Sequence, residues 1–183
     1  MPLPRPQRRK LLHTRHVELR GYEREDGLLD IEARLTDEKT YAFGNEDRGG
    51  INPGDYVHDM RVRLTITPDQ EIIEATASMD ATPYAICPAV APNYARLVGL
   101  RLGKGFLKSA MMRMAGVEGC THLRELLQPL ATAAFQTTVG LKSGFANKTA
   151  IEEPALSHSL LNSCHAYDEH GPVIARRRAQ AAE

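Results

Sequence analysis

The chain has 183 residues, with 23 lysines and arginines balanced by 23 aspartates and glutamates, so its formal net charge is zero. That length suits one domain with its own hydrophobic core, and the zero charge gives no electrostatic reason to expect nucleic acid or a membrane as partner. No apolar run approaches the roughly 20 residues that span a bilayer, and the first residues lack the apolar block of a signal peptide. Three dispersed cysteines argue against a disulfide framework and favour a reducing, cytoplasmic location.

Residues 1–12 are rich in proline and arginine and predict a mobile basic arm. Alternation of apolar and polar residues then predicts a strand around residues 16–20 and another over residues 29–35. An Asp-Gly pair between them is typical of a hairpin. Only a three-residue loop pairs apolar Leu19 with apolar Ala33, which predicts a type I turn followed by a glycine bulge.

A segment dense in turn-forming residues, 44–55, predicts a loop. Alternation then predicts two further strands, over residues 56–66 and 73–79. His58 falls on the apolar face, at one end of its strand, where a histidine is either a core residue with satisfied hydrogen bonds or a catalytic group. Asp59 and Asp80 fall on the outward face and are solvated unless a neighbouring element covers them.

Helical segments are predicted after Tyr84, one that Pro92 could start and one over residues 104–115. Five basic residues accompany these segments without an acidic neighbour among them: Arg96, Arg101, Lys104, Lys108 and Arg113. Such a run is either a solvated face or a local site for an anion, such as a substrate carboxylate, an acidic partner or a membrane surface.

The clearest helical pattern begins near Cys120 and continues to about residue 138, with a kink expected at Pro129 because proline lacks an N–H donor. Thr121 is the expected N-cap. Cys120 and His122 would then lie at the positive end of the helix dipole, which favours a thiolate and a neutral imidazole. His122 is therefore a candidate general base, and the alternative is that both residues are half-buried capping residues.

Residues 139–155 predict a polar loop that could serve as a lid, while residues 157–175 are compatible with either a helix or a hairpin. Strands come first and helices follow, without alternation. This order predicts an α+β fold, with an antiparallel sheet of about four or more strands in the N-terminal half packed by three to four helices in the C-terminal half. One domain is expected over residues 13–177, followed by a frayed tail, 178–183.

A set of short strings spread over residues 10–177 forms a specific composite: Arg20-Gly21-Tyr22, Asp26-Gly27, Asp30-Ile31-Glu32, Lys39-Thr40-Tyr41, Asp47-Arg48-Gly49-Gly50, His58-Asp59-Met60, Gly119-Cys120-Thr121-His122-Leu123 and Cys164-His165. Together they resemble a bacterial domain-of-unknown-function family, number 2889. The chain is also similar to the phenylcoumaran γ-formaldehyde lyases of bacterial lignin-dimer catabolism. The resemblance implies an aldehyde-releasing carbon–carbon lyase and assigns no catalytic residue.

Such a lyase needs no cofactor. A base removes the hydroxyl proton of a hydroxymethyl group, the carbon–carbon bond breaks to release formaldehyde, and the electrons form a stilbene double bond as the furan C–O bond opens to a phenolate. One base, one acid and a site for a planar aromatic substrate suffice. The candidate catalytic residues are His122 and His58 as bases, Asp59 or Asp80 as the group orienting an imidazole, and Tyr84 as a hydrogen-bond donor to the phenolate. The candidate substrate-binding residues are Cys120, Arg101, Lys104 and His165.

Two other classes of function stay open. A zinc or iron–sulfur scaffold could draw on ligands from Cys87, Cys120, His122, Cys164 and His165, although the chain has no Cys-x-x-Cys pair. A non-catalytic module that binds a small ligand is the other. The chain lacks a phosphate-cradling glycine loop and a dinucleotide fingerprint. The expected partner is a small aromatic substrate, not a nucleic acid or a membrane, and a homo-oligomer is compatible with the sequence.

Overall fold

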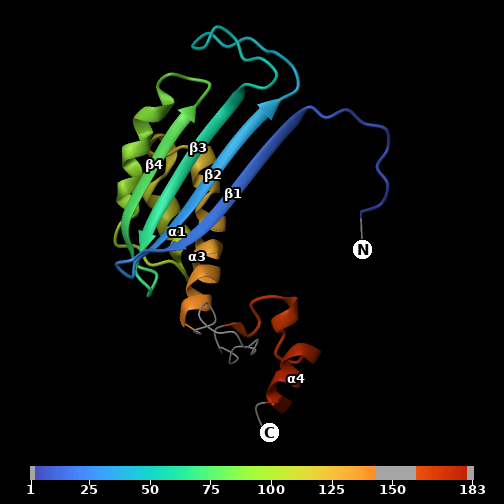
Figure 1. Cartoon of the computed structure of the whole chain (residues 1–183), viewed down its shortest axis with the longest axis vertical. Coiled ribbons are helices and arrows are strands. Elements are labelled where there is room, and N and C mark those ends of the chain that lie inside the picture. Colours follow the sequence, from blue (N-terminus) through green and yellow to red (C-terminus); the bar gives the residue numbers. More distant parts are fainter. Residues whose placement is uncertain (1–2, 143–159, 181–183) are drawn as a thin grey trace. The chain divides into compact units, whose positions relative to one another are not determined.

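A computed structural model describes residues 3–142 and 160–180 of the chain. Their contacts divide the chain into two compact units, residues 1–142 and residues 143–183, where one domain was expected over residues 13–177. The first unit is an antiparallel sheet of four strands followed by helices, which confirms the predicted α+β class (Figure 1).

The sheet is a simple meander in which each strand pairs with the next along the chain, in the order β1-β2-β3-β4. The strands are β1 (His13–Glu23), β2 (Leu29–Lys39), β3 (Tyr56–Ile66) and β4 (Ile72–Ala81). Leu19 lies opposite Ala33, as predicted. The N–H of Arg24 donates to the carbonyl of Leu28 at 2.9 Å, and Gly27 adopts a φ of 79°. These two observations confirm the three-residue turn with its glycine bulge.

The helices of the first unit pack on one face of the sheet (Figure 1). They are η1 (Cys87–Leu97), α1 (Phe106–Arg113), η2 (Gly116–Glu118), α2 (Thr121–Glu125) and α3 (Leu127–Lys142). The core lies between this layer and the sheet. Its sheet side is built from alternate residues such as Leu35, Met60 and Leu64, and its helix side from residues such as Tyr94 and Leu127, all buried.

Strand β4 departs from simple alternation at its start. The ladder shifts between Thr65 and Ile66, so that Ile66 pairs with Ile72 while Thr65 pairs with Glu74. Ile73 is the extra residue of this irregularity and is 42% exposed, whereas Ile72 is fully buried. Simple alternation over residues 73–79 predicts that Ile73 shares the apolar face with Ala75 and Ala77, and the bulge is the reason that it does not.

The helix predicted from Cys120 to residue 138 is two helices, α2 and α3, because the α-helical hydrogen bonding is interrupted at Leu126. The N–H of Leu126 donates to Leu123, and the N–H of Leu130 donates to Leu126. Pro129 lies in the first turn of α3, where its missing donor costs no intrahelical bond. A continuous helix would have required that donor to reach Glu125, so the proline accounts for the one-residue break at Leu126. Cys120, not Thr121, is the N-cap residue of α2.

Helix α3 approaches strand β1 closely at Gly21. A Cβ atom added to Gly21 would lie 1.9 Å from the Oγ1 atom of Thr137 and 2.9 Å from its Cβ. Only the absence of a side chain at Gly21 allows this contact, so this glycine fixes how near the helix comes to the edge strand.

The second unit, over residues 160–180, contains η5 (His165–Tyr167) and α4 (Pro172–Gln180). The hairpin considered for residues 164–175 is not formed, and the residues up to Gln180 that were expected to fray are helical. Residues 139–142 belong to α3, and the rest of the predicted lid loop lies outside the described residues. At the N-terminus, residues 3–12 are exposed and carry no regular secondary structure, while their mobility stays a prediction.

Candidate active site

A row of charged and polar side chains crosses the core-facing side of the sheet at one end. Arg15 on β1 lies opposite Asp37 on β2, and Asp37 lies opposite His58 on β3. Two residues further along each strand, toward the core, the residues that face one another are apolar. Moving along the strands, the helix-covered face therefore changes from hydrophobic to charged within two residues. We call Arg15, Asp37 and His58 the polar row.

Asp37 is the centre of the polar row and is only 3% exposed. Its carboxylate accepts hydrogen bonds from Arg15 (Nε at 2.9 Å and Nη2 at 2.8 Å), from Nε2 of His13 at 2.7 Å and from Nδ1 of His58 at 2.9 Å. Burial alone would raise the pKa of Asp37, but these donors outweigh burial and hold the pKa far below its ordinary value. Asp37 is therefore a permanently charged acceptor that fixes three side chains.

Helix α2 brings His122 against the polar row, because its buried Leu123 anchors the helix in the core. The imidazole rings of His58 and His122 stack with their centroids 3.8 Å apart and their planes 33° apart. Glu125, also on α2, forms an ion pair with Arg15 and so ties the helix to the edge strand. Residues distant in sequence thus meet at this end of the sheet.

Asp37 sets the tautomer of His58. Because Nδ1 of His58 donates to the carboxylate, the proton sits on Nδ1 and the opposite nitrogen, Nε2, is left as an acceptor. The pKa of His58 lies below its ordinary value, first because the ring is buried and then because of the nearby charge of His122. His58 is therefore an oriented, neutral imidazole.

The pKa of His122 is shifted in the opposite direction. Its Nδ1 atom lies 3.8 Å from Sγ of Cys120, and this thiol raises the pKa of His122 above its ordinary value. Burial would raise the pKa of Cys120, but His122 and the backbone N–H groups of Leu123 and His122 together lower it. The pKa of Cys120 is therefore lowered, in the direction expected from the sequence, whereas the pKa of His122 is raised where a lowered one was expected. Since α2 has only five residues, its dipole is weak beside the direct contact with sulfur.

The carboxylates expected to orient an imidazole lie elsewhere. Asp59 accepts from Arg34 (Nε at 2.9 Å and Nη2 at 2.8 Å) on the outer face of the sheet, and these bonds lower its pKa. Asp80 pairs with Arg61 on the same face. The orienting carboxylate of the structure is Asp37, a cross-strand neighbour of His58 that the sequence analysis did not select.

The remaining candidates are spread over the surface. Tyr84 is 59% exposed between β4 and η1. Arg101 donates to the backbone carbonyl of Asp69 at 2.6 Å and lies 3.5 Å from Glu71, so it braces a turn. Lys104 is exposed, before α1. His165 belongs to the second unit. Arg96 pairs with Glu118, which supports the solvated-face interpretation of the basic run.

All three cysteines are free, as predicted. Of the five residues considered as metal ligands, Cys120 and His122 are neighbours, while Cys164 and His165 lie in the second unit. Within residues 3–142 and 160–180, the group whose donor atoms could surround an ion is a different one: Asp37, His58 and His122, with donor atoms all within 4.8 Å of one another.

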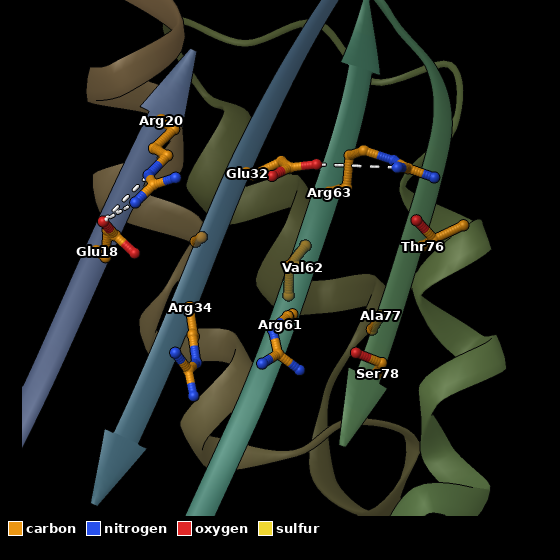
Figure 2. A pocket seen from close by; sticks show the side chains of 11 residues that line it. Glu18, Arg20, Glu32, Arg34, Arg61, Val62, Arg63, Thr76, Ala77 and Ser78 are labelled. Carbon is orange, nitrogen blue, oxygen red and sulfur yellow. Dashed lines mark hydrogen bonds and ion pairs between the residues drawn. The ribbon is translucent and has the colours of Figure 1, made fainter. Parts of the chain in front are cut away.

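The outer face of the sheet carries a hollow of about 420 Å3 (Figure 2). Four arginines contribute to it, and each one faces a carboxylate. The pairs are Arg20 with Glu18, Arg34 with Asp59, Arg61 with Asp80, and Arg63 with Glu32. Because these charges cancel within the sheet, the hollow is a network of ion pairs, and among the described residues that line it each arginine has a carboxylate partner.

A family model matches residues 13–136, from the start of β1 into α3. The chain belongs to the family described as "Protein of unknown function (DUF2889)". The matched segment contains the polar row, His13, Cys120, His122 and Glu125. A comparison with curated proteins and with solved structures found no match. None of the helices in the described ranges, 3–142 and 160–180, has the length and apolar character needed to cross a bilayer.

Proposed function

We propose that the chain is an enzyme that uses general acid–base catalysis, with His58 as the base and His122 as the acid. The observation that carries this proposal is the stacked pair of imidazoles, one held by a buried carboxylate and the other beside a thiol. Two like charges at a centroid separation of 3.8 Å repel, so protonation of one ring disfavours protonation of the other. Groups whose environments push their pKa values apart are suited to opposite roles in one reaction.

The reaction class we propose is the cofactor-independent lyase reaction that the family resemblance suggested. Nε2 of His58 takes the hydroxyl proton of the hydroxymethyl group, and the carbon–carbon bond breaks to release formaldehyde. The electron pair forms the stilbene double bond, and the furan C–O bond opens to a phenolate. The imidazolium of His122 gives its proton to that phenolate oxygen. One proton is taken and one is given, so the reaction needs no redox partner.

The other residues hold this pair in place. Asp37 keeps the Nδ1 proton on His58, and Arg15 and His13 hold Asp37. Cys120 favours the charged form of His122. His122 is only half-buried, so substrate would reach the pair from the His122 side. The free thiols support the expected cytoplasmic location.

The test follows formaldehyde release and stilbene absorbance from a phenylcoumaran dimer, with the variants His58→Gln and His122→Gln. Each should lose about a hundredfold or more in turnover. The pH profile separates the roles, because the acidic limb reports the base and the alkaline limb reports the acid. His58→Gln should lose the acidic limb, and His122→Gln should lose the alkaline one.

His16→Gln is the matched control, because His16 is an exposed histidine on the outer side of β1 and should leave activity unchanged. Unchanged turnover in a folded His58→Gln protein would contradict the proposed base. Binding of the dimer without formaldehyde release by the unmodified chain would support a ligand-binding module instead.

A second candidate function is metal binding, favoured by the proximity of Asp37, His58 and His122. The carboxylate oxygens of Asp37 already accept hydrogen bonds from Arg15, His13 and His58. Asp37 is therefore better suited to orient a histidine that binds the metal than to bind the metal itself. Two imidazoles then remain, fewer than the three protein ligands of a typical catalytic zinc site. Zinc retained stoichiometrically by the purified protein and lost in His58→Gln would favour this candidate over acid–base catalysis.

A further inference from the structure

Strand β1 forms one edge of the sheet and is exposed along most of its eleven residues. Its pairing with β2 is regular from end to end, without a bulge, and it contains neither proline nor lysine. Bulges, prolines and lysines are among the features that usually keep an edge strand from pairing with another chain. The protective features that β1 does have are charged side chains, such as Arg15, Glu18 and Arg20. The opposite edge differs, because the start of β4 bonds to residues 99–102, as in the 2.9 Å bond from the N–H of Ile72 to Leu100.

The backbone groups that β1 presents at its free edge follow from the ladder. Arg24 donates to Leu28, and Thr40 donates to Leu12, so the even-numbered residues of this register are the ones bonded toward β2. In an antiparallel ladder the alternate residues point their N–H and C=O groups the other way. Val17, Leu19 and Gly21 therefore aim their backbone groups at the free edge.

We propose that two copies of the chain pair through β1 in antiparallel orientation, joining their sheets into one of eight strands. Glu18 and Arg20 pair within one copy, and in the proposed dimer they would also face each other across the axis. These charges favour an axis at Leu19 over an axis one residue to either side. With the two-fold axis at Leu19, Glu18 of each copy lies opposite Arg20 of the other, and opposite charges at facing positions stabilise a strand pair. Shifting the axis to residue 18 or to residue 20 would instead place two glutamates or two arginines against each other.

An apolar groove lies beside this edge, between β1 and α3. Its lining is Leu19, Gln128, Pro129, Thr132, Ala133 and Gln136. In the proposed register the grooves of the two copies come together around the axis at Leu19, so pairing also removes apolar surface from water. The exposed side chain of Val17 would lie opposite Gly21 of the second copy, where the side chain of Thr137 on α3 packs over the glycine.

The experiment measures the mass of the full-length protein by sedimentation over a dilution series. The unmodified chain should reach twice its mass of 20.2 kDa. Glu18→Arg and Arg20→Glu should each raise the dimer dissociation constant by about tenfold or more, because each places two like-charged pairs across the axis. The double variant Glu18→Arg/Arg20→Glu should restore the dimer. Glu74→Arg, a charge reversal on exposed β4, is the matched control and should leave the dimer intact.

Amide hydrogen exchange gives a second readout on the same proteins. The N–H groups of Val17, Leu19 and Gly21 should be protected in the dimer and should exchange rapidly in Glu18→Arg, while the even-numbered amides keep their protection. A monomeric unmodified chain would overturn the proposal. The proposal would also be overturned if neither single charge reversal changed the dimer dissociation constant. It would be overturned too if the edge bound an unrelated extended peptide while the chain stayed monomeric.

Discussion

At the residue scale, the two stacked histidines make a direct prediction for their titration. In the unmodified protein the pKa of His58 should lie below that of His122, because burial and the charge of His122 lower the first while Cys120 raises the second. In His122→Gln the pKa of His58 should rise toward the ordinary value of about 6.5 and stay below it, since burial persists. NMR titration of the imidazole Cε1 protons measures both values.

His16→Gln serves as the reference for this titration, because it removes an exposed histidine from the outer face of β1. It should leave both pKa values where they are. A His58 whose titration does not respond to His122→Gln would show that the two rings are not in electrostatic contact.

The lowered pKa of Asp37 predicts how the stability of the folded protein depends on pH. Its pKa is lowered in the folded state, so its stabilising contribution is complete above the unfolded value of about 4 and is lost as pH falls toward the folded value. Asp37→Asn should reduce the free energy of unfolding by about 2 kcal/mol or more near neutral pH, because Arg15 and His58 lose their charged partner. Urea unfolding should show this difference narrowing below about pH 4. A difference independent of pH would assign the loss to packing.

The polar row could have been predicted in part from the sequence. The predicted pairing of Leu19 with Ala33 fixes the whole register, and continuing it by two steps places Arg15 opposite Asp37. The predicted strands, around residues 16–20 and over residues 29–35, stop short of Arg15 and Asp37 because the apolar members of the alternation end at Val17 and Leu35. Polarity changed there, but the alternation of faces did not. The sequence offers Asp59 or Asp80 as the orienting group, but both carboxylates pair with arginines on the outer face of the sheet, whereas His58 points to the inner face.

At the element scale, the contact between α3 and β1 depends on Gly21. Gly21→Ala should lower the free energy of unfolding by about 1–3 kcal/mol, because the new methyl group has no room beside Thr137. Adding Thr137→Ala should recover part of the loss, since it removes two of the three crowding atoms. Thermal unfolding of the single and double variants measures this. Gly27→Ala is an unsuitable control, because Gly27 has a positive φ.

Secondary structure could be predicted well where one physical signal dominated. The four strands and the first turn followed from alternation and register. The break at Leu126 is not visible in the apolar spacing, because that spacing continues in phase across it. The effect of Pro129 appears earlier in the chain, since its missing N–H leaves the carbonyl four residues before it without a helical partner. The bulge at Ile73 left no mark in the pattern, since both Ile72 and Ile73 are apolar.

At the scale of the whole molecule, the first unit contains everything that the proposed chemistry uses. The buried cluster of the core and the residues around His58 all lie before residue 143. A fragment of residues 1–142 should therefore unfold cooperatively and keep the paired titration of His58 and His122. Thermal unfolding and the same NMR experiment test this. A fragment that does not fold would show that the second unit supplies stability to the first.

Two irregularities in the ladder flank the polar row, between Asp37 and Glu38 on β2 and between Asp59 and Met60 on β3. The first of these lies in the β2–β3 ladder next to the connection between β2 and β3, and the second lies in the β3–β4 ladder. Residues 46, 48 and 49 near the tip of the connection are exposed. Doubling a loop's length costs only about 0.6 kcal/mol in closure entropy. For protein engineering, an insertion at this tip should therefore cost little stability, provided that Asp47 keeps its bond from the N–H of Ala85 and Arg48 keeps its bond to the carbonyl of Tyr56.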